Sequence, residues 1–272
     1  NNAIACLTGI GSSSHTTNFE YKIFDRKGNR KQIERAEFPE IEFLALGFGT
    51  GLNAISNRKS NWDDYNPFGS DNIFEELEAG KFKVTFTGCD FPSACFVSID
   101  SRDSNNDILR IARVTHWERE EGNTVAYIET YYYEDEERKA GVDDSSEISV
   151  ILLGDGEALT RSFPKDAKIY AGIYSNGGDE EFYWSNNPDF TAEDIADLRT
   201  IAPQFKGENA RRGSCNMVQL HGEGDLLGVY PSHSYPLNSG KHGFKINSFS
   251  LETGEEVDAV GKRSFIYIAQ TF

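Results

Sequence analysis

Between residues 100 and 107, side chains that carry oxygen atoms occur at nearly every second position. Aspartate and asparagine oxygens spaced in this way are typical of calcium-binding loops. Ile108 stands where the usual loop requires glycine, and no glutamate follows at the fixed distance that supplies a bidentate ligand. The sequence therefore leaves calcium open as a cofactor and predicts no other, with the candidate ligands Asp100, Asp103, Asn105 and Asp107.

Histidine does not indicate a second metal site, because none of the 5 histidines forms a pair at helical metal-ligand spacing. His221, Glu223, Asp225 and His233 share one glycine-rich stretch, but polar loops of this composition also occur without a metal. The chain has no Gly-x-Ser-x-Gly elbow for a serine nucleophile. We therefore predict no catalytic residues and expect the protein not to be an enzyme.

The most enzyme-like segment is a glycine turn after an apolar strand, Ile41-Glu-Phe-Leu-Ala-Leu-Gly-Phe-Gly-Thr-Gly-Leu-Asn53. It resembles the first motif of class I S-adenosylmethionine-dependent methyltransferases, where glycine lets a ligand approach bare backbone. Ala45 departs from that motif, which usually has an acidic residue there, and a glycine turn at a strand exit needs no cofactor. The resemblance implies a cofactor site at Gly47, Gly49, Gly51 and Asp90.

Tyrosine and tryptophan cluster near polar turns in three places. Exposed aromatic side chains beside polar residues are a common way for a sheet to bind sugar rings or a protein partner. Consecutive aromatics also arise simply because strand residues alternate between the core and the rim, so both explanations stay open. The candidate ligand-binding residues are Tyr131, Tyr133, Tyr183, Trp184, Tyr230 and Tyr235.

The 4 cysteines are too few for a disulfide scaffold in a chain of 272 residues. Cys89 and Cys95 bracket the segment Asp-Phe-Pro-Ser-Ala between two predicted strands. This spacing predicts a local disulfide if the compartment is oxidising, and buried thiols are the alternative.

The charge balance limits the partners. With 44 acidic and 27 basic residues the net charge is −17, which repels phosphate backbones and anionic lipid head groups. No apolar run approaches the roughly 20 residues of a membrane-spanning helix. We therefore expect neither nucleic-acid binding nor membrane insertion.

Most of the elements that would position these residues are predicted to be β-strands, because apolar and polar residues alternate along them. In the segment 81–88, Phe82, Val84 and Phe86 share one face, and the segments 95–99 and 168–174 follow the same pattern. Only the segment 191–203 predicts a helix, over residues 192–202. Ile195, Leu198 and Ile201 share one helical face, Thr191 can cap the helix and Pro203 can end it. The sequence therefore predicts a mostly β fold of tandem antiparallel β-sandwich modules with one short helix.

A two-strand motif recurs three times, over residues 18–47, 125–154 and 243–269, and each copy is interpreted as a hairpin. Ile41, Ile148 and Phe265 mark equivalent positions, at intervals of roughly 110 residues, which is about the length of one small sandwich. The predicted domains are a partial β module or N-terminal strands over 1–51, a sandwich over 52–154, and a sandwich with a helical insertion over 155–272.

The stretch 80–154 carries a further pattern in Gly80-Lys-Phe-Lys-Val-Thr-Phe-Thr-Gly88, Arg113-Val-Thr-His-Trp117 and Val142-Asp-Asp-Ser-Ser-Glu-Ile-Ser-Val150. It resembles a β-sandwich repeat of secreted bacterial proteins of unassigned function. The resemblance implies the fold and an extracellular context, and it implies no catalytic residues.

These patterns predict a non-enzymatic extracellular or surface β protein that acts in binding, adhesion or assembly. The segment Arg263-Ser-Phe-Ile-Tyr-Ile-Ala269 resembles the closing strand of some phage tail proteins, so a virion structural protein fits as well. The alternatives are a class I methyltransferase and a carbohydrate-binding, lectin-like module. The expected partners are a protein, a glycan or copies of the chain itself in a homo-oligomer or polymer, because an incomplete first module would need strands from another subunit.

Overall fold

The computed structural model of the protein describes residues 4–12, 17–32, 52–58, 63–65, 71–89, 94–101, 107–153, 167–176, 183–185, 190–194, 201–205, 211–220, 222, 226–231, 235–236, 242–243, 246–257 and 261–270. These residues form strands and turns and no helix. Every strand pair with a described register is antiparallel. The predicted mostly β fold is therefore confirmed.

The chain forms two compact units. Unit 1 consists of Asn1–Glu40, Ala54–Asp90 and Phe96–Ile151, and unit 2 of Ile41–Asn53, Phe91–Cys95 and Leu152–Phe272. The predicted organisation into tandem sandwich modules, with its boundaries, stays a prediction.

Unit 1 is organised around a five-stranded sheet. The strands β8 (Arg110–Glu120) and β9 (Asn123–Glu134) form a long hairpin in this sheet. Since β8 pairs along one edge of β9, the strands β6 (Lys81–Phe86) and β10 (Glu137–Ala140) must share the other edge, one after the other. The strand β5 (Ile73–Glu78) pairs with β6 and completes the sheet.

Apolar and polar side chains alternate along β6, and this alternation decides which face of the strand is buried. Phe82, Val84 and Phe86 are fully buried, whereas Lys81 lies exposed and Lys83 half-buried on the opposite face. This is the arrangement that the sequence predicts, because successive side chains of a strand point to opposite sides of the sheet.

The ends of β6 and β10 meet beside Thr130 of β9. The Thr130 N–H donates to Gly80 O at 2.8 Å, and the Gly141 N–H donates to Thr130 O at 3.0 Å. The buried Thr130 hydroxyl also donates to Gly141 O at 3.0 Å. Gly80 has φ +78, and a Cβ there would lie 2.5 Å from the Gly141 nitrogen, so this junction requires glycine.

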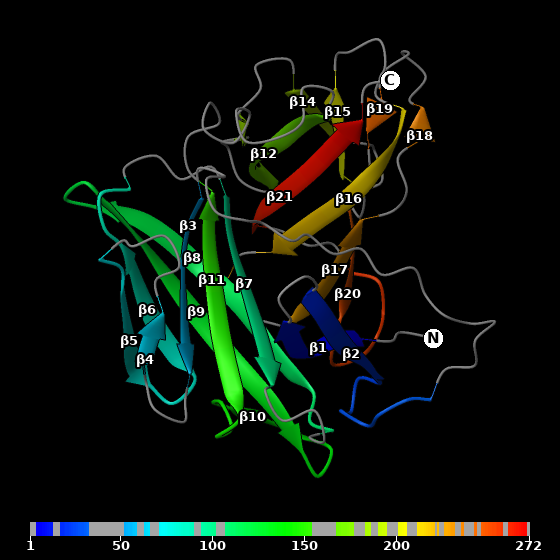
Figure 1. Ribbon diagram of the computed structural model, residues 1–272. Coiled ribbons are helices and arrows are strands. Elements are labelled where there is room, and N and C mark those ends of the chain that lie inside the picture. Colours follow the sequence, from blue (N-terminus) through cyan, green and yellow to red (C-terminus); the bar gives the residue numbers. More distant parts are fainter. Residues whose placement is uncertain are drawn as a thin grey trace. The chain divides into compact units, whose positions relative to one another are not determined.

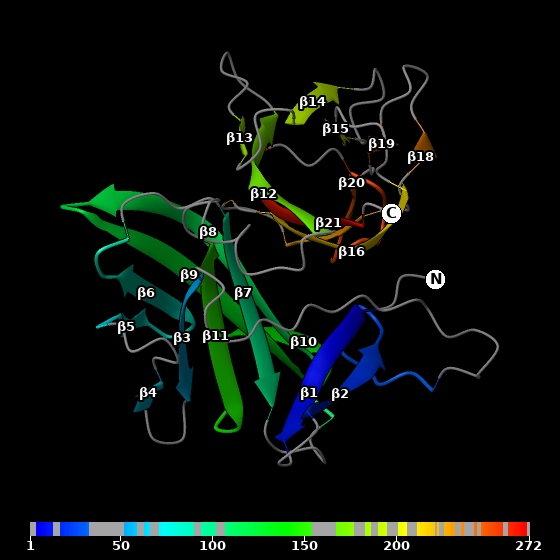
Figure 2. The same ribbon diagram turned by 45° about the horizontal axis from the view of Figure 1, so that its top comes forward.

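A four-stranded sheet forms a second layer of unit 1, and Figures 1 and 2 both show its strands crossing in front of β8 and β9. Its order is β4 (Asp63–Tyr65), β3 (Leu52–Arg58), β11 (Ser146–Leu153) and β7 (Ala94–Ser101). Ile148, Val150 and Leu152 alternate along β11 and are all buried. The buried faces of the two sheets supply the apolar core of the unit.

A two-stranded hairpin of β1 (Ile4–Ser12) and β2 (Thr17–Phe24) completes the described part of unit 1. Its chain continues into a turn over residues 25–31, in which Asp25 Oδ1 accepts hydrogen bonds from the N–H groups of Lys27 and Asn29 at 2.9 and 3.0 Å. The Lys31 N–H returns to Ile23 O at 2.8 Å, so the turn folds back on β2. We call residues 4–12 and 17–32 the N-terminal hairpin.

Unit 2 contains two sheets. One has the order β13 (Tyr183–Ser185), β12 (Ala167–Asn176), β21 (Gly261–Gln270) and β16 (Arg211–Leu220). The other has the order β17 (Leu227–Pro231), β20 (Ile246–Ser250), β15 (Ile201–Phe205), β19 (His242–Gly243) and β18 (Tyr235–Pro236), with β14 (Phe190–Asp194) paired to β15.

The helix predicted over residues 192–202 is wrong at both of its ends, and residues 195–200 between them lie outside the described residues. β14 and β15 occupy its two ends and pair with each other, from Phe190 with Phe205 to Asp194 with Ile201. The prediction depended on three apolar residues at helical spacing, and cross-strand pairing outweighs so short a pattern.

The interpretation of the repeat as a hairpin is also wrong in the two copies that the structure describes. In the second copy β9 and β11 belong to different sheets, because β10 follows β9 directly and takes the free part of its edge. In the third copy β20 and β21 likewise belong to different sheets. The second strand of the first copy lies outside the described residues.

Candidate functional site

The solvent-facing side of β6, β8, β9 and β10 carries aromatic and charged side chains that contact one another. Cross-strand partners share a face, so the registers place Lys83 with Tyr127, and Arg113 with Glu129. We call this surface the outer face and define it by Lys83, Arg113, His116, Glu118, Glu120, Tyr127, Glu129, Tyr131 and Arg138.

Tyr131 is the centre of the outer face. Its hydroxyl donates to Glu129 Oε2 at 2.9 Å, and the same oxygen accepts from Arg113 Nε at 2.8 Å. The Arg113 guanidinium carbon lies 5.9 Å from the Tyr131 ring centroid, and that of Arg138 lies 5.3 Å from it. Both guanidinium groups are within the range of cation–π attraction, so the phenol is held between two cations from different strands.

The pKa values of Glu129 and Tyr131 are both shifted away from neutral pH. Burial alone would raise the pKa of Glu129, but hydrogen bonds from Arg113 and Tyr131 outweigh it and hold the pKa below its ordinary value. Burial and the hydrogen bond to Glu129 raise the pKa of Tyr131. General acid–base catalysis requires a pKa near the working pH. Neither Glu129 nor Tyr131 is therefore poised to transfer a proton near neutral pH.

A second aromatic pair lies farther along the same face. The rings of His116 and Tyr127 are stacked, with centroids 4.2 Å apart and planes inclined by 11°. The Tyr127 hydroxyl donates to Glu118 Oε1 at 3.1 Å, and Lys83 Nζ donates to Glu120 Oε2 at 3.3 Å. Burial, followed by the hydrogen bond to Glu118, raises the pKa of Tyr127.

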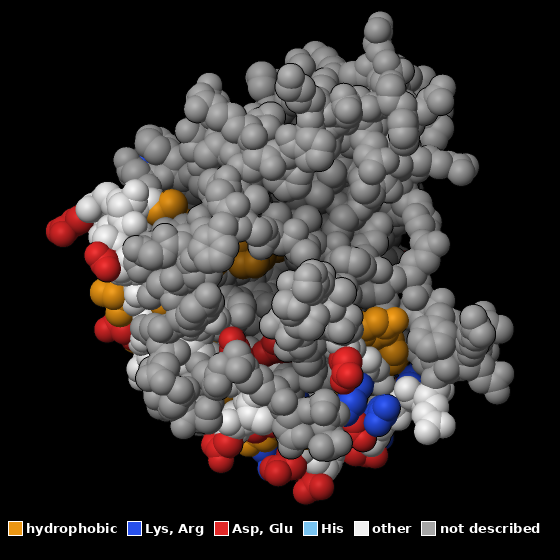
Figure 3. All heavy atoms as spheres, viewed as in Figure 1, with side chains coloured by type: hydrophobic (Ala, Val, Ile, Leu, Met, Phe, Trp, Pro, Cys, Tyr) orange, Lys and Arg blue, Asp and Glu red, His pale blue; other side chains and the backbone are white. Residues whose placement is uncertain are grey.

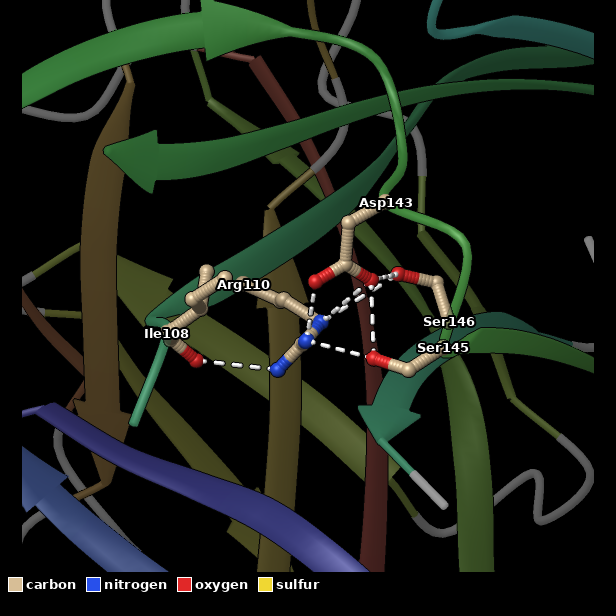
Figure 4. A network of polar contacts seen from close by, with 5 residues as sticks. All are labelled: Ile108, Arg110, Asp143, Ser145 and Ser146. Carbon is tan, nitrogen blue, oxygen red and sulfur yellow. Dashed lines mark hydrogen bonds and ion pairs between the residues drawn. The ribbon is translucent and has the colours of Figure 1, made fainter. Parts of the chain in front are cut away.

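A polar network on the opposite side of β8 is structural (Figure 4). The Arg110 side chain is fully buried, and Nε donates to Asp143 Oδ1 at 3.1 Å, while a second nitrogen contacts Asp143 Oδ2. That second nitrogen, Nη2, also donates to Ser145 Oγ at 2.9 Å, and Nη1 donates to Ile108 O at 3.0 Å. The Ser146 hydroxyl donates to Asp143 Oδ1 at 2.6 Å. The network joins β8 to the turn that leads into β11.

Asp143 is ionised at neutral pH. Burial alone would raise its pKa, but hydrogen bonds from Arg110 and Ser146 hold the pKa below the ordinary value. Sequence patterns did not single out Arg110, and they placed Asp143 in a solvated turn, whereas its side chain is only 17% exposed. The available signal was an arginine at an inward position of the alternation in β8.

The structure gives Asp107, one of the calcium candidates, two cationic neighbours. Lys22 Nζ lies 2.7 Å from its Oδ1, and Arg30 contacts both of its oxygens at 3.1 and 3.2 Å. The hydrogen bond from Lys22 holds the pKa of Asp107 below its ordinary value. A calcium ion at Asp107 would have to displace both positive groups.

The other calcium candidates are not brought together with it. Asp100 is buried on β7, and Asp103 and Asn105 lie outside the described residues. Within the residues described, no group of three or more His, Cys, Asp or Glu side chains is arranged to hold a metal ion. Calcium binding stays a prediction.

The structure separates the six aromatic candidates. Tyr131 lies on the outer face, whereas Tyr133 packs against the buried cluster of Phe24 and Leu109. Tyr183 and Trp184 are in β13, and Tyr230 and Tyr235 are in β17 and β18 of the other sheet of unit 2. The side chains of these last four lie outside the described residues.

Several other predicted sites fall on residues that the structure does not describe. They are Gly47, Gly49, Gly51 and Asp90 of the glycine turn, and His221, Glu223, Asp225 and His233. Cys89 is half-buried and Cys95 fully buried, both are thiols in the structure, and burial raises the pKa of Cys95 far above its usual range. The Cys89–Cys95 disulfide stays a prediction.

Comparison with known proteins gives no further assignment, since no family model, curated protein or solved structure matches the chain. The described part of the chain contains no helix long and apolar enough to cross a membrane.

Proposed function

We propose that the protein is a non-enzymatic binding protein of an extracellular or surface structure, and that it holds a protein partner on the outer face. The observation that carries this proposal is the arrangement of Tyr131, with its ring between Arg113 and Arg138 and its hydroxyl on Glu129. The same role fits a surface appendage or a virion component.

The residue types of the outer face support a protein partner. Tyrosine and arginine are enriched among the residues that contribute most to protein interfaces. Here the contacts among Arg113, Glu129 and Tyr131 hold the side chains in one arrangement before a partner arrives, which lowers the ordering cost of binding. Arg138 is exposed and supplies a charge at the rim.

The shifted pKa values support binding over acid–base catalysis. Glu129 remains ionised and both Tyr127 and Tyr131 remain protonated around neutral pH, so the face presents constant charges. The methyltransferase alternative predicts helices between the strands, and the part of the chain that the structure describes has none. Calorimetry with S-adenosylmethionine tests that alternative directly, and no heat of binding is expected.

Photo-crosslinking tests the proposal. A photoreactive phenylalanine analogue is placed at position 140, where an exposed alanine is the cross-strand partner of Tyr131, and the full chain is exposed to the surface fraction of its source. We expect one protein adduct that is lost in Tyr131→Ala and retained in Tyr21→Ala, a matched change at an exposed tyrosine of β2. No adduct from position 140, or equal adducts in both variants, would overturn the proposal.

A glycan array distinguishes the proposed protein partner from the lectin-like alternative. If the protein bound defined glycans and Tyr131→Ala abolished that binding, the outer face would recognise carbohydrate and not protein. We expect no such binding, because guanidinium groups lie against the Tyr131 ring on which a sugar would have to stack.

A further inference from the structure

The strand β5 forms an edge of the five-stranded sheet of unit 1. Among the described strands it pairs with β6 alone, and Figures 1 and 2 both show it as the outermost strand beside β6. A strand at the edge of a sheet presents backbone N–H and C=O groups to which an extended segment of another chain can pair. The side chains of β5 decide which segments fit this edge.

Two large apolar side chains of β5 are open to solvent. Ile73 and Leu77 are 50% and 56% exposed, and in the described part of the chain Tyr21 is the one other large apolar residue that is exposed. Figure 3 shows apolar and acidic side chains next to one another on the left edge of the view, where Figure 1 draws β5. Charges alone are enough to protect an edge against unwanted pairing. The apolar groups of β5 serve no such purpose and are available to contact an added strand.

The charges of the sheet alternate in sign from strand to strand toward β5. Arg113 of β8 faces Glu129 of β9, which in turn faces Lys81 of β6. Lys81 faces Glu78 of β5, and its Nζ lies 2.5 Å from Glu78 Oε1. The hydrogen bond to Glu78 raises the pKa of Lys81, and the charge of Glu129 adds to this effect. The row therefore ends on a negative charge at the edge.

A second row ends in the same way. Tyr127 of β9 faces Lys83 of β6, and Lys83 faces Glu75 of β5. The hydrogen bond to Glu120 raises the pKa of Lys83, and the charge of Glu75 contributes to the same shift. Opposite charges directly across from one another stabilise paired strands. A further strand beside β5 would continue both rows if it carried cations opposite the two terminal glutamates.

A second copy of β5 does not meet this requirement. Three of the six residues in the strand Ile-Phe-Glu-Glu-Leu-Glu are glutamates, so pairing between two copies brings like charges together. Like charges directly opposite one another are destabilising. The net charge of −17 also makes whole copies repel each other. The charge of the edge therefore favours a cationic segment of another protein.

We propose that β5 binds an extended segment of another protein that carries lysine or arginine at alternate positions, opposite Glu75 and Glu78. The segment adds to the sheet as a further strand and places apolar residues beside Ile73 and Leu77. Backbone hydrogen bonds supply the affinity in this mode of binding, and alternate side chains supply the specificity. The proposal does not rest on a partner at Tyr131.

Nuclear magnetic resonance titration of the full-length chain tests the proposal. The probe is a peptide of alternating lysine and valine with threonine at both ends, and a matched peptide has glutamate in place of lysine. We expect the lysine peptide to shift the amide signals of residues 73–78 and the glutamate peptide to leave them unchanged. The proposal is wrong if the lysine peptide shifts none of these signals.

A third peptide separates strand pairing from simple attraction to an acidic protein. Methylation of every backbone nitrogen keeps the lysine charges but removes all the N–H groups that pair with a strand edge. We expect this peptide to leave the signals of β5 unchanged. Shifts as large as those from the unmethylated peptide would show attraction without pairing and would contradict the proposal.

A charge-removing variant tests the two terminal glutamates. In Glu75→Gln/Glu78→Gln the affinity for the lysine peptide should fall about tenfold, because two favourable cross-strand pairs are lost. Glu252→Gln/Glu255→Gln removes the same charge from exposed residues of the turn after β20 and should bind like wild type. Tyr131→Ala should also bind the peptide like wild type, so this proposal and that of the outer face fail separately. Equal losses in the two glutamine variants would overturn the proposal.

Hydrogen exchange of the wild-type chain covers the case in which a variant does not fold. The lysine peptide should slow the exchange of residues 73–78, and unchanged exchange would contradict strand addition. Exchange at β5 that slows as the chain alone is concentrated would identify a second copy as the occupant, against the proposal.

Discussion

Arg110 and Asp143 form a buried ion pair that ties the start of β8 to the turn before β11, with side-chain exposures of 0% and 17%. Ser145 accepts a further hydrogen bond from Arg110, and Ser146 donates one to Asp143. The two sheets of unit 1 are therefore linked by polar contacts as well as by their apolar faces.

Removal of one partner from this pair should destabilise the protein strongly. Arg110→Met leaves the Asp143 carboxylate partly buried without its cation, and such losses cost about 3–5 kcal/mol. Urea unfolding should show a much lower midpoint. Lys139→Ala breaks an exposed ion pair with Glu134 and serves as the control, with no expected change. Equal midpoints for the two variants would contradict a structural role for Arg110.

Acid should weaken the fold through Asp143. Its pKa is lower in the folded protein than the ordinary value of 3.8, so its contribution to stability is complete above 3.8. That contribution disappears as the pH falls through the folded pKa. Urea midpoints measured from neutral pH downward should be level and then fall below about pH 4, and the fall should be smaller in Asp143→Asn. An unchanged profile in Asp143→Asn would argue against the shift.

Gly80→Ala should be much more damaging than Gly122→Ala. Both glycines have positive φ, +78 and +81, so alanine costs about 1 kcal/mol at either one. At Gly80 the new Cβ would also lie 2.5 Å from the Gly141 nitrogen and 2.9 Å from Thr130 O, whereas the space around Gly122 is open. Thermal unfolding of the two variants makes the comparison, and similar melting temperatures would show that the junction beside Thr130 can relax.

Cys89 and Cys95 should differ in reactivity. Cys95 is fully buried and its pKa is raised, so little thiolate is present and reagents cannot reach it. In reduced native protein, alkylation followed by peptide mass mapping should label the half-buried Cys89 faster than Cys95. Omission of the reductant also tests the predicted disulfide, because a Cys89–Cys95 bond would protect both residues.

Far-UV circular dichroism should show very little helix. The described residues form strands and turns only, and an α/β enzyme of this length would give roughly a third or more helix. A strong helical signal would contradict the mostly β architecture and would favour the methyltransferase alternative.

The sequence was informative wherever local alternation decides the structure. The burial of Phe82, Val84 and Phe86 was predictable because a strand with one apolar face can be placed in only one way on a core. The helix prediction depended on Ile195, Leu198 and Ile201. Three apolar residues at helical spacing influence the structure less than the pairing of β14 with β15.

The candidate site was less predictable, because its properties depend on residues far apart in the sequence. Tyr131 and Tyr133 are two positions apart in β9, so the alternation of the strand predicts the same face of the sheet for both. Only Phe24 and Gly28, more than a hundred positions earlier, place Tyr133 in a packed cluster. Arg110 was missed for the same reason, since its role appears only when Asp143 is brought to it.

The docking of the N-terminal hairpin has a consequence for the nascent chain. The hairpin leaves the ribosome well before its docking surface, because Glu136, which binds Lys27, is made 109 residues later. At a synthesis rate of about 5–20 residues per second, Phe24 waits roughly 5–20 s for Leu109 and Tyr133. The hairpin can therefore gain its stabilising contacts only after residue 136 has been made, long after its own two strands are complete.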